Sequence, residues 1–463
     1  MFRFALVAAL CAIAVTTAGA QAPRGVQSEG PPATSDTDHR LRVPYTEFTL
    51  ANGLHVILHR DSSVPVVSVN VWYHVGSANE HPGRTGFAHL FEHLMFEGSK
   101  NVREGAFDEW LEAAGGNNNG STANDRTNYY IDVPSNALEL ALFLESDRMG
   151  YLLEPMSPDR VNGQRDVVKN ERRQSYENAP YGKAFLRLPE LLYPPNHPYH
   201  WSTIGSMEDL SAASYEDVVN FFKTYYVPNN ASLVIAGDID IAATRRLVEK
   251  WFAEIPRGAD PPPIAPPAVT MSGIVKETMT DRVQLPRLYL AWHTPAIFAP
   301  SDGAMDVVSS LLTGGKNARL YKRLVYEMQI AQDVSANQQS QTLGSVFVIR
   351  ATARPGQTLD RIQQVIDEEL DKLRNAPPDE REMQRALNQI EASFYRSMEQ
   401  VGSFGGKADQ LNNYYVRTGT PDYFAEDLAR YRALSAEDIQ SAIARFLPKD
   451  RRVELTVMPE AKQ

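Results

Sequence analysis

The sequence predicts a mixed α/β (α+β) fold built from two similar halves. The chain has 463 residues, which exceeds what one hydrophobic core usually holds and suits two domains of about 200 residues each. Residues 257–268, RGADPPPIAPPA, lie near the middle, and their prolines predict a semi-rigid linker. Strand patterns alternate with helix patterns on both sides of this linker. We therefore expect an N-terminal domain over residues 43–256 and a C-terminal domain over residues 269–463.

The N-terminus has the pattern of an export signal. A basic start at Arg3 precedes an apolar run over residues 4–15, and small residues follow at 18–20. This pattern is typical of a secretory signal peptide, which we expect to span residues 1–20. Residues 21–42 are rich in Pro, Gly, Ser and charge, and predict a flexible leader.

Cysteine usage and charge narrow the class of protein. Cys11 is the only cysteine, and the large Leu10 before it argues against a lipidated cysteine. No later segment has the 18 or so apolar residues of a membrane helix. We expect a soluble exported protein, periplasmic if the source is a bacterium with two membranes. Without Arg3 the chain has 45 basic and 57 acidic residues, a formal charge of −12, which argues against a nucleic-acid partner.

The N-terminal half opens with strand patterns. Residues 46–50 and 54–59 flank Asn52-Gly53 and predict a hairpin. Residues 66–75, VVSVNVWYHV, predict a central strand. Three histidines alternate with apolar residues in these strands, and we expect them on the polar face: His55, His59 and His74.

The stretch 86–98, GFAHLFEHLMFEG, predicts a helix closed by Gly98 at the position after its end. Its apolar residues recur at helical spacing and predict a core-facing stripe: Phe87, Leu90, Phe91, Leu94 and Met95. Beside the stripe lie His89, Glu92 and His93. Because residues four apart lie one turn above each other, both imidazoles can reach the same point in space.

Two converging imidazoles are a common way to bind zinc. The spacing H-x-x-E-H is that of the inverzincins, in which the glutamate holds a metal-bound water without being a ligand. The alternatives are hydrogen-bonded structural histidines or a purely structural metal. The apolar stripe beside the motif favours a catalytic metal.

The next elements are a helix through Phe107 and Trp110, a Gly/Asn-rich stretch over residues 115–130 and a helix over 138–149. The Gly/Asn density predicts a turn that enters a polar strand. This stretch is either a surface loop or a sheet edge that binds an extended peptide through its backbone.

Ser157-Pro158-Asp159 predicts the start of a helix, with a capping serine and proline at the first position. Zinc held by two imidazoles usually takes a third protein ligand, often a carboxylate. Glu171, in this helix, is a candidate, but spacing alone does not distinguish it from other acids such as Glu177.

A helix ending near Tyr226 and a strand over residues 231–237 complete the first half. Beyond the linker the predicted order is a strand (288–293), helices (302–312 and 319–328), a strand (345–352) and long helices (359–374 and 378–400). His293 is the only histidine of this half, which has no H-x-x-E-H. The sequence therefore predicts a duplication with one active copy.

These features together resemble the pitrilysin, or M16, family of zinc peptidases, over nearly all of the chain after residue 20. The resemblance rests on the histidine motif and on several further features: Gly115-Gly116, Asn119, Thr122, Thr127 and Tyr129, residues 165–171 (RDVVKNE), Gly205, Gly237-Asp238 and the duplicated second half.

The resemblance implies a role for each of these positions. His89, His93 and Glu171 would bind one Zn²⁺ per chain, and Glu92 would be the general base. Asn119 and the adjoining Gly120 and Ser121 would bind the substrate backbone. Each half would be an α/β sandwich of the LuxS/MPP-like metallohydrolase type, the two facing each other across a cleft. The size resembles that of mitochondrial processing peptidase and its bacterial relatives, which work as dimers.

The chain departs from the family pattern at two places. Gln164 stands where a second glutamate commonly supports the metal site, so it adds no negative charge there. Val325 and Gln332 stand where active members have an arginine and a tyrosine that hold substrate. We therefore expect a sister M16 subunit to supply that pair in a heterodimer. The rival interpretation is a non-catalytic subunit of the same fold that binds peptides or has a structural role.

Overall fold

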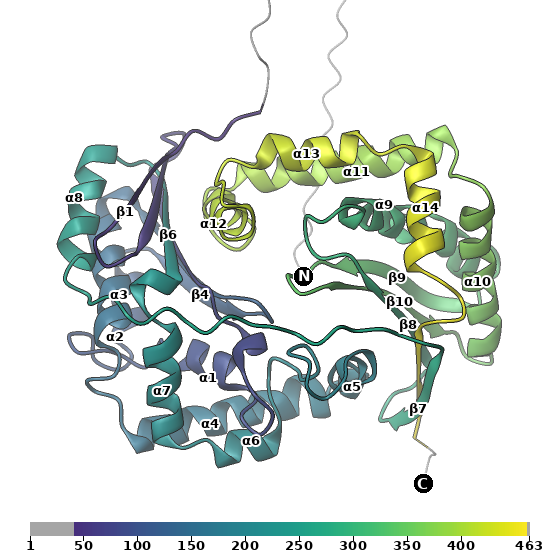
Figure 1. The fold of residues 1–463 in the computed structure, drawn as a ribbon, viewed down its shortest axis with the longest axis horizontal. Coiled ribbons are helices and arrows are strands. Elements are labelled where there is room, and N and C mark those ends of the chain that lie inside the picture. Colours follow the sequence, from purple (N-terminus) through teal and green to yellow (C-terminus); the bar gives the residue numbers. More distant parts are fainter. Residues whose placement is uncertain (1–40, 461–463) are drawn as a thin grey trace, which may run out of the picture. The chain divides into compact units, whose positions relative to one another are not determined.

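The computed structural model describes residues 41–460. The predicted signal peptide and most of the predicted leader lie outside this range. The described residues form two β-sheets with helices packed against them (Figure 1), so the mixed α/β fold in two halves is confirmed. No helix among them is long and apolar enough to cross a membrane.

The first sheet has six strands in the order β1-β2-β6-β3-β5-β4. The strands are β1 (Thr46–Thr49), β2 (His55–Arg60), β3 (Val66–Tyr73), β4 (Asn117–Thr122), β5 (Thr127–Pro134) and β6 (Ala231–Gly237). β2 and β6 are parallel, and the other neighbours are antiparallel. β4 forms one edge, so the polar Gly/Asn-rich stretch is a sheet edge.

The first half has eight helices among the described residues, and most of them lie on one face of this sheet. They are α1 (Phe87–Leu94), α2 (Ala106–Ala113), α3 (Leu138–Tyr151), α4 (Pro158–Arg172), α5 (Gly182–Leu192), α6 (Met207–Ala212), α7 (Tyr215–Tyr225) and α8 (Ile241–Phe252). The apolar stripe predicted for residues 86–98 is buried here: Phe87, Leu90, Phe91, Leu94 and Met95 all belong to the core between the sheet and these helices. Burial of each such side chain contributes about 1.5–3 kcal/mol.

The second sheet repeats the topology of the first. Its strands are β7 (Val275–Asp281), β8 (Arg287–Thr294), β9 (Ala331–Gln339), β10 (Ser345–Ala353) and β11 (Val453–Pro459), in the order β7-β11-β8-β10-β9. One parallel pair is followed by antiparallel pairs, as in β2-β6-β3-β5-β4. The predicted duplication is therefore present in the fold.

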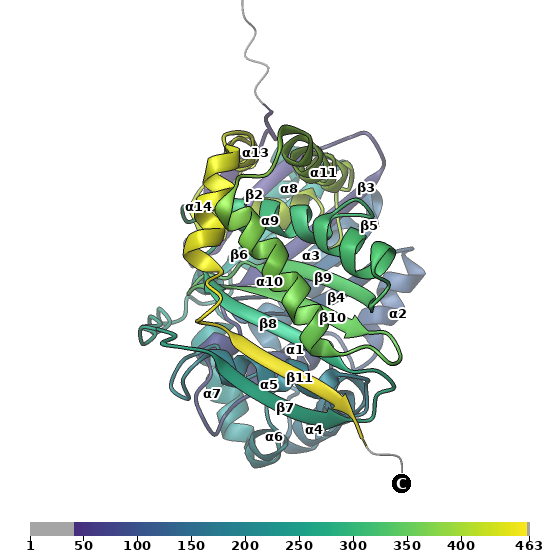
Figure 2. The same cartoon turned by 90° about the vertical axis from the view of Figure 1, so that its right-hand side faces the viewer.

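Figure 2 shows helices in front of this second sheet. The helices of this half are α9 (Asp302–Thr313), α10 (Leu359–Asn375), α11 (Glu380–Glu399), α12 (Lys407–Thr418), α13 (Phe424–Arg432) and α14 (Ala436–Phe446), and a π-helical turn spans Tyr321–Glu327. The predicted linker has neither helix nor strand.

Each sheet is also covered on its second face, by a helix from the other half. α12 packs on β6, β3 and β2, and α5 packs on β11 and β8. Asp409 of α12 fixes this packing, because its carboxylate accepts hydrogen bonds from Trp72 Nε1 and Asn128 Nδ2, both at 2.8 Å. Both sheets are therefore buried on two faces.

This packing overturns the polar-face prediction for the strand histidines. His59 is only 5% exposed, and its Nδ1 lies 2.7 Å from the carbonyl oxygen of Pro44. The ring of His55 stacks on Tyr415 of α12 with centroids 3.8 Å apart. His74 follows β3, and burial lowers its pKa to about 4. The prediction was wrong because α12, which is distant in sequence, closes the face that alternation alone marks as solvent-exposed.

The predicted end of the motif helix was also wrong. α1 ends at Leu94, and turn hydrogen bonds from Phe96 N to His93 O and from Glu97 N to Leu94 O follow it. Gly98 has φ +93°, but it lies four residues beyond the helix end. It instead allows the close approach of the carbonyl of Val102, which would lie 2.7 Å from an added Cβ.

Candidate metal centre

The start of α1 is held by residues outside the helix. Gly86, the residue before it, has φ +88° and offers no side-chain cap. The Glu80 carboxylate instead accepts hydrogen bonds from Gly86 N at 3.0 Å and Ala88 N at 2.8 Å. These bonds satisfy two of the backbone donors that the first turn of the helix leaves unpaired. Together with the buried apolar stripe, these contacts fix the rotation of α1 and therefore the direction of its histidines.

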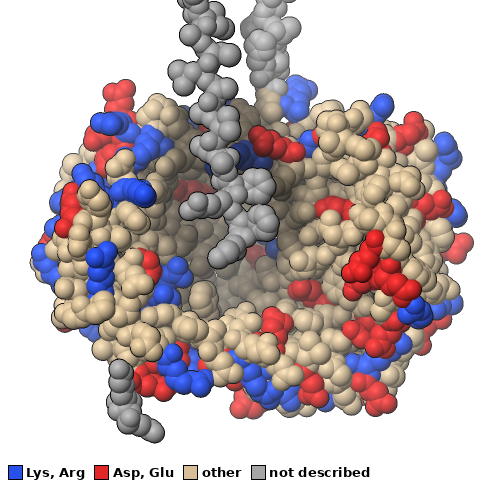
Figure 3. All heavy atoms as spheres, turned by 180° about the vertical axis from the view of Figure 1, so that it is seen from behind, with Lys and Arg blue, Asp and Glu red and all other residues tan. Residues whose placement is uncertain are grey.

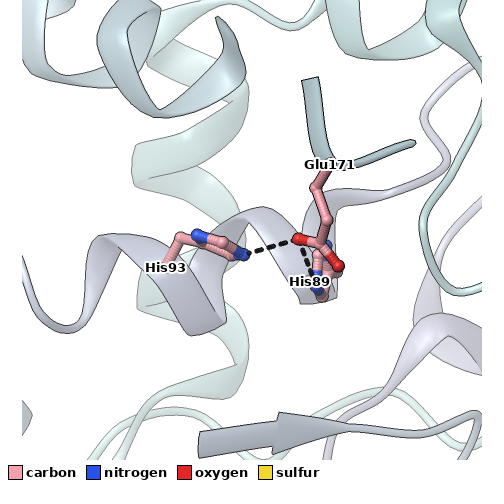
Figure 4. A group of neighbouring side chains, drawn as sticks. All are labelled: His89, His93 and Glu171. Carbon is pink, nitrogen blue, oxygen red and sulfur yellow. Dashed lines mark ion pairs between the residues drawn. The ribbon is translucent and has the colours of Figure 1, made fainter. Parts of the chain in front are cut away.

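Glu171 reaches these histidines from α4. The Ser157 side chain caps α4 as predicted, by accepting a hydrogen bond from Arg160 N. Val161 and Val168 bury the helix face against the core. Figure 4 shows the Glu171 carboxylate directed between the two imidazoles. Its Oε2 lies 3.2 Å from His93 Nε2 and 3.6 Å from His89 Nε2.

These separations fit a shared metal ion. Ligand atoms about 2.1 Å from a tetrahedral ion lie about 3.4 Å from one another, between the two distances given for Glu171. Among the described residues, His89, His93 and Glu171 are the one group of histidine and carboxylate side chains with this spacing. Glu177, the other acid that spacing allowed, instead accepts a hydrogen bond from Arg172 Nε at 3.0 Å.

The protonation states also suit ligands. Burial, with a smaller effect of the neighbouring His93, lowers the pKa of His89 to about 4, so this imidazole is neutral at pH 7. The hydrogen bond with His93 lowers the pKa of Glu171, which keeps it ionised. Neutral imidazole and ionised carboxylate are the forms that bind a metal ion.

Glu92 lies beside the group without belonging to it. Its Oε2 accepts a hydrogen bond from Thr122 Oγ1 at 2.6 Å, at the end of edge strand β4. Burial raises the pKa of Glu92, the direction that suits a proton acceptor working near neutral pH. The site thus offers three candidate ligands and a separate carboxylate oriented by a threonine.

Edge strand β4 runs directly past Glu92. A Cβ added to Gly120 would lie 3.0 Å from Glu92 Cγ and 3.1 Å from the ring of Tyr129, so a side chain here would have to displace both. Asn119 is exposed. Ser121 Oγ is engaged within the hairpin, because it donates to Asn128 Oδ1 at 2.6 Å. An edge strand also keeps one row of unpaired backbone groups, which another chain can use.

The remaining residues singled out from the sequence lie in other surroundings. Gln164 Nε2 donates to Glu97 Oε1 at 2.5 Å and so contacts the segment that follows α1. Val325 packs against the core of the second half. Gln332 is exposed at the start of β9. The structure thus brings His89, Glu92, His93, Glu171 and β4 together, with Val325 and Gln332 on the second half.

Sequence reasoning assigned no role to three side chains that surround this site. Thr122 was noted only as part of the family pattern, and its bond to Glu92 depends on the pairing of β4. Glu97 carried a usable signal, because it lies four residues after His93. Glu80 carried no local signal, since it caps α1 across a loop.

Comparison with known proteins decides the family. A family model described as "Insulinase (Peptidase family M16)" matches residues 55–191, and one described as "Peptidase M16 inactive domain" matches residues 212–390. A zinc protease of Helicobacter pylori, PqqE, is 32% identical over 385 residues, which cover 82% of this chain and 86% of that protein. The chain belongs to the M16 peptidase family.

A further relative and two solved structures are also similar to this chain. A probable mitochondrial-processing peptidase subunit beta of Arabidopsis thaliana is 24% identical and covers 90% of this chain and 79% of its own. The crystal structure of a protease from Helicobacter pylori superposes with a TM-score of 0.84 at 28% identity, covering 90% of this chain and all of that one. A putative M16-like peptidase from Alicyclobacillus acidocaldarius, at 23% identity and a TM-score of 0.78, shares the fold. A metalloprotease function is therefore supported at the level of the family.

Proposed function

We propose that this chain is the catalytic subunit of a zinc endopeptidase that hydrolyses unfolded peptides. The observation that carries the proposal is the meeting of His89, His93 and Glu171 at metal-ligand separations, with Glu92 beside them. The names of the relatives support zinc as the metal.

The donor set fits one zinc ion, which His89, His93 and Glu171 would hold. Zinc in such a site lowers the pKa of water and polarises a carbonyl group. Glu92, held by Thr122, takes a proton from the attacking water and delivers it to the leaving amine. The peptide lies against the free edge of β4 as an added strand, and Gly120 lets its backbone come close to Glu92.

The missing arginine and tyrosine support a heterodimer. An oxyanion at the scissile carbon needs donors besides a metal ion. Val325 is apolar and packs against the core of the second half, so its side chain donates no hydrogen bond to substrate. We propose that a sister M16 subunit supplies both groups from its own second half, and that the complex works outside the cytoplasm after removal of the signal peptide. On the face drawn in Figure 3, acidic and basic side chains are interspersed, which suits a protein partner better than a nucleic acid.

An assay of an internally quenched, unfolded peptide tests the proposal. The purified chain is assayed with zinc, alone and with an M16 chain that has the arginine and the tyrosine. We expect turnover only in the mixture. Full turnover by the chain alone would refute the heterodimer, and no turnover with any sister chain would favour the non-catalytic subunit.

A further inference from the structure

A second site is suggested by a cavity away from the candidate metal centre. The cavity has a volume of about 240 Å³ and lies between α5 of the first half and the face of the second sheet that carries Tyr289 and Arg350. It has room for about eight water molecules. Asn124 and the 55% exposed Phe185 also line it.

The cavity wall has polar groups without protein partners. Tyr289 and Tyr193 are 3% and 7% exposed, yet neither hydroxyl has a hydrogen-bond partner among the described residues. The same holds for Ser335 Oγ and Arg350 Nε. Leaving a buried polar group unpaired costs about 1–3 kcal/mol. Four such groups around one cavity need hydrogen-bond partners from outside the described residues, either water or a bound ligand.

The register of the sheet places three of these residues in one row. Arg350 of β10 lies directly opposite Ser335 of β9 on one side and Tyr289 of β8 on the other. Side chains directly opposite on one face have Cβ atoms about 4.5–5.5 Å apart. Their donors therefore converge on one region of the cavity wall.

The charge balance of this wall favours an anion. The Arg350 side chain forms no ion pair or hydrogen bond with any other described residue. Two acids of the described part of the chain lie near this wall. Asp125 is already engaged, because Thr342 N donates to its Oδ2 at 2.9 Å and the Tyr199 hydroxyl donates to its Oδ1. Asp333 lies two residues before Ser335 on the same face of β9, opposite Thr352, and forms no ion pair with Arg350. A guanidinium matches the planar geometry of a carboxylate, and hydroxyl groups can donate to the same oxygens.

We propose that this cavity binds a carboxylate of the peptide substrate, with Arg350 as the residue that determines specificity. This inference rests on the proposed function only in naming the ligand as a substrate. Asn124, which lines the cavity, lies four residues after Gly120, the residue beside Glu92. An extended chain rises about 3.3 Å per residue, so Asn124 lies at most about 13 Å from Gly120 along β4 and the turn after it. A peptide of a few residues bound along β4 could therefore reach the cavity.

The direction of the bound peptide decides which carboxylate arrives. A peptide antiparallel to β4 would bring to Asn124 an acidic side chain that precedes the scissile bond. A parallel peptide would bring the C-terminal carboxylate. Both sources present the same chemistry to Arg350, so the ligands of the test must separate them.

Calorimetric titration of the Glu92→Gln chain, without zinc and without a partner, provides a readout independent of hydrolysis. The ligands are three N-acetylated alanine-based pentapeptides: one with a free C-terminus, one amidated, and one amidated with a central glutamate. We expect one of the two carboxylate peptides to bind at least about tenfold more tightly than the neutral peptide, as for a charge-assisted hydrogen bond. Arg350→Gln should abolish that difference.

Arg381→Gln is the matched control, because it removes an arginine from the exposed surface of α11 in the same half; it should leave the tenfold difference intact. Ser335→Ala is a second, uncharged variant, and we expect it to reduce the difference. Equal affinity of all three peptides for the folded chain, or an unchanged difference in Arg350→Gln, would overturn the inference. A charge-dependent affinity in a chain that never hydrolyses peptides would refute the proposed function and leave this site standing.

Discussion

Removal of the Glu171 carboxylate gives a quantitative test of the candidate metal centre. Glu171→Gln keeps the size of the side chain but replaces a charged oxygen ligand with a neutral amide. Oε2 of Glu171 lies 3.2 and 3.6 Å from the two imidazole nitrogens, close to the edge of a tetrahedron around zinc. Changes in the outer shell of zinc sites alone cost about 10–100-fold in affinity. Loss of a direct ligand should therefore weaken zinc binding at least about 100-fold.

The assay is competition for zinc against a chromogenic chelator at pH 7. Glu177→Gln is the control, because Glu177 lies six residues after Glu171 and pairs with Arg172. We expect this control to bind zinc like the unchanged chain. Equal zinc affinity of Glu171→Gln and Glu177→Gln would refute the assignment of Glu171 as a ligand.

Three further predictions concern the surroundings of the site. Thr122→Val removes the hydroxyl that donates a hydrogen bond to Glu92. Because a hydrogen bond to a charged group contributes about 1.5–3 kcal/mol, kcat should fall about 10- to 100-fold, while the zinc content stays unchanged. Asp409→Ala leaves the donors that meet its carboxylate unpaired, so urea denaturation should show a loss of about 2–4 kcal/mol in the free energy of unfolding. Burial raises the pKa of Glu80 to about 8, so its contribution to stability is complete below the ordinary value of 4.5 and is lost as pH rises through 8. In chelator-treated protein, Glu80→Gln should therefore lose less stability than the unchanged chain between pH 5 and pH 8.5.

Each of these three predictions has its own control or contradicting result. Unchanged kcat in Thr122→Val would show that the threonine does not orient Glu92. Asp450→Asn, at an exposed position, should leave stability unchanged, and an equally small effect of Asp409→Ala would contradict its role in packing α12. Glu112→Gln, also at an exposed position, should lose as much stability between pH 5 and pH 8.5 as the unchanged chain. An equal loss in Glu80→Gln would show that Glu80 does not cause this pH dependence.

Local patterns predicted the elements of the first half well. The hairpin at Gly53, the buried stripe of α1 and the serine-capped start of α4 each depend on residues close in sequence, and each is present. The duplication was also predictable, since both halves repeat one alternation of strands and helices. The five strands of the second sheet follow the same order as five of the six strands of the first.

Features that depend on distant packing were not predictable from local patterns. The burial of His55 and His59 follows from α12, which lies more than 340 residues further along the chain. Strands β7, β9 and β11 were not predicted from the sequence; β11 pairs with β7 and β8, which lie more than 150 residues earlier in the chain. For the site, the histidine pair could be read from spacing, but the position of Glu171 depends on how α4 crosses α1.

The most direct measurement compares zinc content and peptide hydrolysis in the unchanged chain and in Glu92→Gln, each with the sister subunit. If Glu92 is the general base beside a zinc ion held by His89, His93 and Glu171, both proteins contain one zinc, and Glu92→Gln loses hydrolysis by about 100-fold or more. Undiminished hydrolysis in Glu92→Gln, or an active unchanged chain that contains no zinc, would contradict this mechanism.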